Sequence, residues 1–177
     1  MFEKILQPIS YTIGIIVMFA IPICLYAIKM DYNSQSVCDD AVQQFVDRSR
    51  AAGYISASNY SEMVSTITAT GNLYNISIYH QSKICYPGKD NKGFDYNYMT
   101  YTTDEILNAL FDESGGGQYN MKNGDYLKVT YSLKDPTLGA KIYSMWTSHS
   151  YKSIRGSYGG YVGSAGEMGD MPDEMTT

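Results

Sequence analysis

The chain offers few side chains that could carry out catalysis. Its only histidines are His80 and His149. Nucleophilic catalysis would need one of them to deprotonate a serine or cysteine, with an acid to orient its ring. No Gly-x-Ser-x-Gly motif is present. His80 ends a predicted strand and His149 follows a predicted helix, so we expect both at the surface and predict that the chain is not an enzyme.

The sequence also lacks the patterns that bind metal ions or nucleotides. It has no Cys-x-x-Cys pair and no Cys/His spacing typical of zinc. The acidic residues do not form the Asp-x-Asp-x-Asp-Gly pattern of a calcium loop. The glycine run 115–117 is not followed by Lys-Ser or Lys-Thr, so it predicts a flexible loop and not a phosphate site. We therefore predict no metal site and no cofactor.

Two cysteines could form a covalent link. Cys38 and Cys85 both lie outside the long apolar segment near the N-terminus. In an exported domain they could form a disulfide that joins the first helix to a strand. The alternative is two separate buried thiols. Cys24 lies within the apolar segment, where it most simply acts as an apolar side chain.

Composition excludes one class of partner and favours another. The formal net charge is −5 and no basic patch stands out, so we do not expect nucleic acid as a partner. Tyrosine is frequent, with 18 residues against 5 Phe and 1 Trp. An apolar ring with a wet hydroxyl suits half-exposed strands and subunit contacts.

The elements that would position these residues begin with a membrane anchor. Residues 9–28 contain no charged side chain, and a helix of that length spans about 30 Å, the thickness of a bilayer core. No small-x-small cleavage site follows, so we expect the segment to be retained. Pro22 removes one backbone donor and should bend the helix. We assign residues 1–33 to a single-pass anchor of the cell membrane, with the following domain extracytoplasmic.

Residues 34–162 predict a small α+β head. Apolar residues at helical spacing continue the first helix to Gly53, and strands are indicated by alternating patterns at 73–80, 126–134 and 154–162. Shorter strands are predicted at 83–86 and 98–101, with a loop over 87–97. Further helices are predicted to begin at Asn59, Thr102 and Pro136. We expect a long N-terminal helix and an antiparallel sheet of about four strands, flanked by two or three short helices.

The C-terminal segment differs in composition. Residues 163–177 contain Glu167, Asp170, Asp173 and Glu174 but no basic residue. A short, acidic segment with glycine and little apolar content is typical of disorder. We predict a disordered acidic tail.

Several short sequences follow one another between about residues 10 and 162, after an anchor that ends near Tyr26. They are Gln44-Phe45-Val46-Asp47, Gly53-Tyr54-Ile55, Tyr60, Thr70-Gly71-Asn72-Leu73-Tyr74-Asn75-Ile76, Tyr101-Thr102-Thr103-Asp104-Glu105-Ile106, Gly124-Asp125-Tyr126-Leu127, Pro136-Thr137-Leu138 and Tyr158-Gly159-Gly160. In this order and layout, the chain resembles the TadE-like minor pilins of the tight-adherence (Tad/Flp) pilus systems, in the version found in single-membrane bacteria.

The resemblance implies a structural or assembly subunit of a type IV-like surface pilus. Its partners would be the membrane and other pilin or pilus-assembly subunits, with copies of itself among them. In such fibres the apolar helices pack as the filament core and the heads cover the outside. The residues implied for helix packing in the membrane or filament core are Gly14, Ile15, Phe19 and Pro22. Those implied for subunit contacts are Val37, Phe45 and Tyr54.

Two alternatives stay open at this point. Type IV-like prepilins carry Glu at the fifth position of the apolar run, whereas Gly14 is followed here by Ile-Ile-Val-Met. The subunit could therefore enter a filament or stay in the membrane as an accessory factor. The other alternative is a membrane-tethered extracellular module for binding or adhesion.

Overall fold

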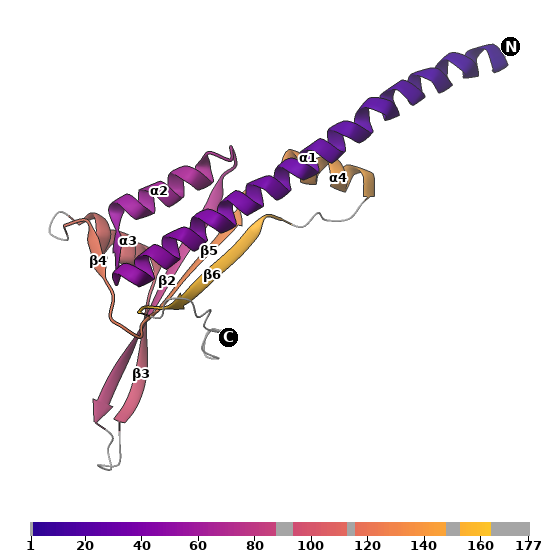
Figure 1. The fold of residues 1–177 in the computed structure, drawn as a ribbon. Helices are drawn as coiled ribbons and strands as arrows, with labels where there is room; N and C mark the ends of the chain where they lie inside the picture. The colour runs from indigo at the N-terminus through magenta and orange to yellow at the C-terminus, as the bar shows by residue number, and fades with distance from the viewer. Residues whose placement is uncertain (1, 88–93, 113–115, 148–152, 164–177) are drawn as a thin grey trace.

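A single long helix organises the molecule. The computed structural model describes residues 2–87, 94–112, 116–147 and 153–163. Helix α1 (Phe2–Ala52) has 51 residues, so it is about 75 Å long. It ends at Gly53, which has a φ of 77°. The Gly53 N–H donates to the Ser49 carbonyl and closes the last turn of the helix. The N-terminal part of α1 projects from the head, while its C-terminal part lies along the sheet (Figure 1).

The main sheet is antiparallel, as the alternating patterns predict. Its strand order is β3-β2-β5-β6. The strands are β2 (Tyr74–Pro87), β3 (Phe94–Tyr101), β5 (Tyr126–Leu133) and β6 (Arg155–Tyr161). A second sheet pairs the short strands β1 (Tyr54–Ser56) and β4 (Gln118–Asn120).

Three shorter helices complete the fold, namely α2 (Ala57–Thr68), α3 (Thr103–Phe111) and α4 (Leu138–Thr147). The expected capping box of Thr102 and Glu105 opens α3. Helix α4 begins after Thr137, whose hydroxyl accepts the Ala140 N–H at 3.0 Å as an N-terminal cap.

The core lies between α1 and one face of the main sheet. Val42, Phe45 and Val46 of α1 are at most 1% exposed. They belong to one apolar cluster with Val129 and Tyr131 of β5. The apolar stripe read from the sequence is therefore the face of α1 that buries against the head. The α+β architecture with its long N-terminal helix is confirmed.

The boundaries of some elements differ from those predicted. The predicted strands 73–80 and 83–86 are one strand, β2, and β3 begins inside the segment expected to be a loop. Helix α2 begins earlier than Asn59, because the Ser56 hydroxyl accepts the Asn59 N–H at 3.1 Å and caps the helix. His149 and the predicted tail from 164 onward lie outside the described residues.

Candidate subunit-interaction surfaces

The first candidate surface is the projecting part of α1. Among the described residues, α1 is the one helix long and apolar enough to cross a membrane, with a mean hydropathy of 2.2 over 18 residues. None of that window is buried within the chain, and Met18 and Phe19 are 72% and 65% exposed. So much exposed apolar surface is unfavourable in water. Lipid tails or other apolar helices would cover this part of α1.

The predicted helix-packing residues all lie on this open surface. A Cβ atom placed on Gly14 would meet no other atom within 4 Å, so another helix could approach the α1 backbone there. Ile15 and Phe19 are both more than half exposed. Pro22 is also exposed, and α1 continues through it as one helix. Pro22 does not interrupt the helix, and membrane helices commonly tolerate a proline in this way.

The second candidate surface is a groove of about 150 Å³ between α1 and α2. Val37, Ala41 and Phe45 of α1 and Met63 of α2 contribute its apolar side chains. Its polar side chains are Asp40, Gln44, Arg48, Asn59, Glu62 and Thr66. An apolar floor with a polar rim is the usual anatomy of a protein interface.

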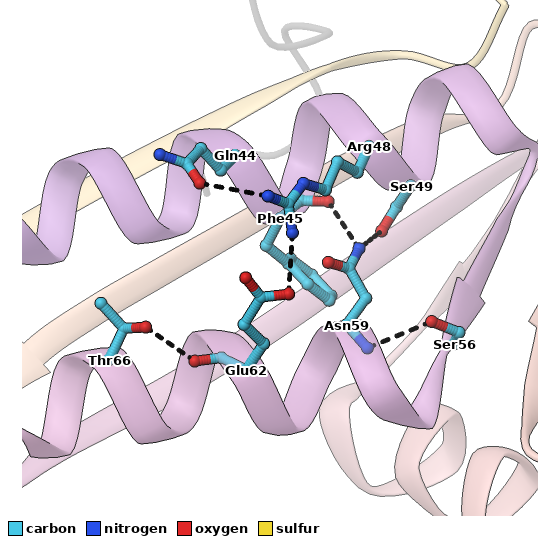
Figure 2. A network of polar contacts seen from close by, with 8 residues as sticks. All are labelled: Gln44, Phe45, Arg48, Ser49, Ser56, Asn59, Glu62 and Thr66. Carbon is cyan, nitrogen blue, oxygen red and sulfur yellow. Dashed lines mark hydrogen bonds and ion pairs between the residues drawn. The ribbon is translucent and has the colours of Figure 1, made fainter.

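Polar contacts hold α2 beside α1 along this groove (Figure 2). The Arg48 Nη1 atom lies 2.8 Å from the Glu62 Oε2 atom, and both side chains are more than half exposed. The Asn59 amide donates to the Ser49 hydroxyl at 3.3 Å and to the Phe45 carbonyl at 3.5 Å. An exposed ion pair adds only about 0–1 kcal/mol to stability, so Arg48 and Glu62 can exchange partners at low cost.

The three predicted subunit-contact residues have different environments. Val37 is 40% exposed and lines the groove, and Tyr54 is 36% exposed on β1. Phe45 is only 1% exposed, and its ring packs edge-on against Tyr60 with centroids 6.3 Å apart. The expectation for Phe45 is therefore wrong, because its side chain borders the groove but faces the core of its own head and leaves almost no surface for a partner.

The predicted disulfide is also wrong, because Cys38 and Cys85 are both free. Cys38 is buried beside Tyr74, at the start of β2, whereas Cys85 is exposed eleven residues further along that strand. Eleven residues of strand span about 36 Å, whereas the Cα atoms of a disulfide lie within about 7 Å. The alternative predicted two buried thiols, and only Cys38 is buried.

His80 is not at the surface, contrary to the prediction. It is 3% exposed, with Nε2 2.9 Å from an Asp125 carboxylate oxygen and Nδ1 2.8 Å from the Tyr119 hydroxyl. Burial lowers the pKa of His80, and Asp125 opposes that shift only in part. The neutral ring can donate from Nε2 to Asp125 and accept at Nδ1 from Tyr119. Both ring nitrogens therefore have protein partners, and the cluster joins β2 to β4.

A third surface is the outer part of the β2–β3 hairpin. Strand β2 pairs with β5 over residues 74–81 and with β3 over residues 80–87, so its outer half has only β3 beside it and projects from the head (Figure 1). Tyr86, Tyr96 and Tyr98 are 46%, 53% and 41% exposed. The Lys83 ammonium lies 3.8 Å from the centroid of the Tyr96 ring. This hairpin presents aromatic side chains to the surroundings.

The described residues contain no cluster of three or more His, Cys, Asp or Glu side chains that could hold a metal ion. Their notable surfaces are apolar or aromatic and suit association with lipid or protein. No protein-family model, curated protein or solved structure matches the chain.

Proposed function

We propose that the chain is a structural or assembly subunit of a type IV-like (Tad/Flp) surface pilus, anchored by its N-terminal helix. The observation that carries this proposal is the division of α1. From Ile9 to Leu25 its large apolar side chains are exposed, whereas its C-terminal half buries one face in the head. The resemblance to TadE-like minor pilins points to the same role.

A helix divided in this way suits movement between two apolar surroundings. In the bilayer, lipid tails cover the projecting half of α1. In a fibre, the equivalent helices of other subunits would cover it instead. Lipid tails and helix side chains are similarly apolar, so close packing and small residues favour the second state. Gly14 provides such a position, because no atom of its own chain occupies the space above it.

The groove between α1 and α2 supplies a contact for a neighbouring head. Val37 offers exposed apolar area in the groove, and the exposed pair of Arg48 and Glu62 offers charges of both signs. An apolar centre within a polar rim excludes water from the contact. This arrangement supports docking of another subunit along α1.

A pair of Gly14 variants tests the packing role. In cells that make the protein, Gly14→Leu should remain in the membrane but be lost from sheared surface fibres. Leucine keeps the segment apolar but holds neighbouring helices apart. Gly14→Ala is the matched control and should retain most of its incorporation. Equal incorporation of both variants would contradict packing through Gly14.

The β2–β3 hairpin favours a second candidate, a membrane-tethered binding or adhesion module. Lys83, Tyr96 and Tyr98 lie on one face of this projecting hairpin and Tyr86 lies on the other, and tyrosine is common at contact surfaces. Replacing Tyr86, Tyr96 and Tyr98 together by serine should abolish adhesion to host or bacterial cells under this alternative. Fibre recovery should be unchanged. Loss of fibre recovery with intact adhesion would reject the alternative.

A further inference from the structure

Helix α4 packs beside the anchor and not beside the sheet (Figure 1). The Thr137 hydroxyl, just before α4, donates to the Asp31 carboxylate at 2.7 Å. A Cβ atom on Gly139 would lie 3.2 Å from the Ala27 backbone carbon. From Thr137 to Gly139 the contacts extend from Asp31 back to Ala27, and Ile142 and Tyr143 border a cavity with Ile21 and Cys24, so α4 and α1 run antiparallel. Glycine at 139 permits this close approach.

The antiparallel course carries α4 along the membrane segment. A cavity of about 230 Å³ lies between Ile21, Cys24, Leu25 and Ile28 of α1 and Gly139, Ile142 and Tyr143 of α4. Ile21 precedes Ile28, the last residue of the uncharged run, by about 10 Å along the helix axis. The second half of α4 therefore lies level with apolar anchor residues and not with the head.

The exposed side of α4 carries two large apolar side chains, with Lys141 between them. Leu138 is 73% exposed and Met145 is 83% exposed. The Ser144 hydroxyl donates to the Lys141 carbonyl at 2.9 Å, so this hydroxyl needs no water molecule as an acceptor. Lys141 is exposed on the first turns of the helix, from which a long side chain can extend its ammonium to the level of lipid phosphates.

We propose that α4 is a second membrane-contacting element, which lies in the bilayer leaflet next to the head. Phospholipid acyl chains fill the cavity between α4 and α1 and cover Leu138 and Met145. The occupant is lipid because the cavity and both side chains continue the exposed apolar surface of the anchor. The inference rests on the membrane anchoring in the proposed function and is independent of fibre entry.

Tryptophan fluorescence in bilayers tests this placement. Trp146 is the chain's only tryptophan, so Trp146→Phe gives a dark background. Into that variant, Met145→Trp, Leu138→Trp or Tyr54→Trp is introduced in the full chain. Each protein is placed in phosphatidylcholine–phosphatidylglycerol vesicles with or without bromine on the acyl chains. Tyr54 is the matched control, because it lies beyond the far end of α1, about 36 Å from Ile28 along the axis.

The expected result is a graded loss of emission. Brominated acyl chains should remove most of the emission from Met145→Trp and less from Leu138→Trp, which lies nearer to Asp31. Emission from Tyr54→Trp should be unchanged. Soluble acrylamide should quench in the opposite order, because it reaches the water-exposed head first.

Three results would overturn the inference. The first is emission from Met145→Trp that brominated lipid leaves intact and acrylamide removes. The second is equal quenching at all three positions. The third is failure of the chain to float with vesicles, which would also remove the anchoring in the proposed function. If the chain floats with vesicles but brominated lipid does not quench Met145→Trp, only the placement of α4 is rejected. Absence of the chain from surface fibres would count against the pilus role and would not affect the placement of α4.

Discussion

The Tyr131 phenol donates a 2.6 Å hydrogen bond to the Asp39 carboxylate and thereby joins the inner strand β5 to the C-terminal half of α1. Tyr131 is 1% exposed. Burial first, and then the neighbouring Asp39, raise the pKa of Tyr131, so the phenol stays protonated and remains a donor. Asp39 lies eleven residues after Ile28, the last residue of the uncharged run, which is about 16 Å along the helix axis. The bond therefore fixes how the head is attached to the anchor.

Removing this hydroxyl should destabilise the head. Tyr131→Phe keeps the ring in the core but loses a hydrogen bond to a charged acceptor, which should lower the free energy of unfolding by about 1.5–3 kcal/mol. Urea unfolding of the full chain in detergent measures the change. Tyr79→Phe is the control, because Tyr79 is 37% exposed, and its effect should stay within about 0.5 kcal/mol. Equal stability of the two variants would contradict a structural role for the bond.

The close approach of β6 to this pair yields a second prediction. A Cβ atom on Gly156 would lie 2.6 Å from the Tyr131 ring and 2.5 Å from the Asp39 carboxylate. Gly156→Ala should therefore force α1 and the sheet apart and cost about 1–3 kcal/mol. Gly14→Ala, where nothing lies within 4 Å, should not lower stability. Thermal unfolding of both variants in the same detergent compares them, and a fully stable Gly156→Ala protein would show that this spacing is wrong.

The buried His80 predicts that the head loses stability in acid. Burial lowers its pKa in the folded chain below the ordinary 6.5, so below that pH the unfolded chain binds more protons than the folded chain. Stability should therefore fall as the pH drops through about 6.5. Urea midpoints at about pH 8 and pH 5 should differ more for the wild type than for His80→Gln. A wild-type head that gains stability in acid would contradict this account.

The cysteines should differ in reactivity. Burial is the main cause that raises the pKa of Cys38, so fewer of its thiols ionise, and the core also blocks reagents. In the folded full chain, Cys85 should react rapidly with a thiol reagent, and Cys38 only after unfolding. Peptide mapping without reductant locates the labels, and Cys85→Ser is the control that removes the fast phase. A peptide linking Cys38 to Cys85 would contradict the structure.

The sequence predicts the regular elements well because periodicity reports burial directly. The stripe of Val42, Phe45 and Val46 indicates the buried face of α1, and the alternation of Val129 and Tyr131 indicates the core side of β5. The capping box at Thr102 is likewise a local signal. These features need no knowledge of what lies across the core.

The features that sequence reasoning missed depend on long-range contacts. His80 is buried because Tyr119 and Asp125, about 40 residues away in the chain, converge on its ring. The short pairing of β1 with β4 has too few residues for a periodic pattern. The periodic pattern of α1 does not show whether Phe45 faces a partner subunit or the core of its own head. The position of α4 beside the anchor follows from Gly139 and Thr137, whose types suggest no partner on their own.

Mass spectrometry of sheared surface fibres and, separately, of membranes from the same cells tests the central claim most directly. The proposed role as a pilus subunit predicts that peptides of this head occur in the fibre fraction together with those of other pilin-type subunits. Fibres recovered from the same cells without this chain, with all of its peptides in the membrane fraction, would contradict the role as a filament component. The N-terminal peptide in each fraction shows whether the chain enters the fibre intact or shortened.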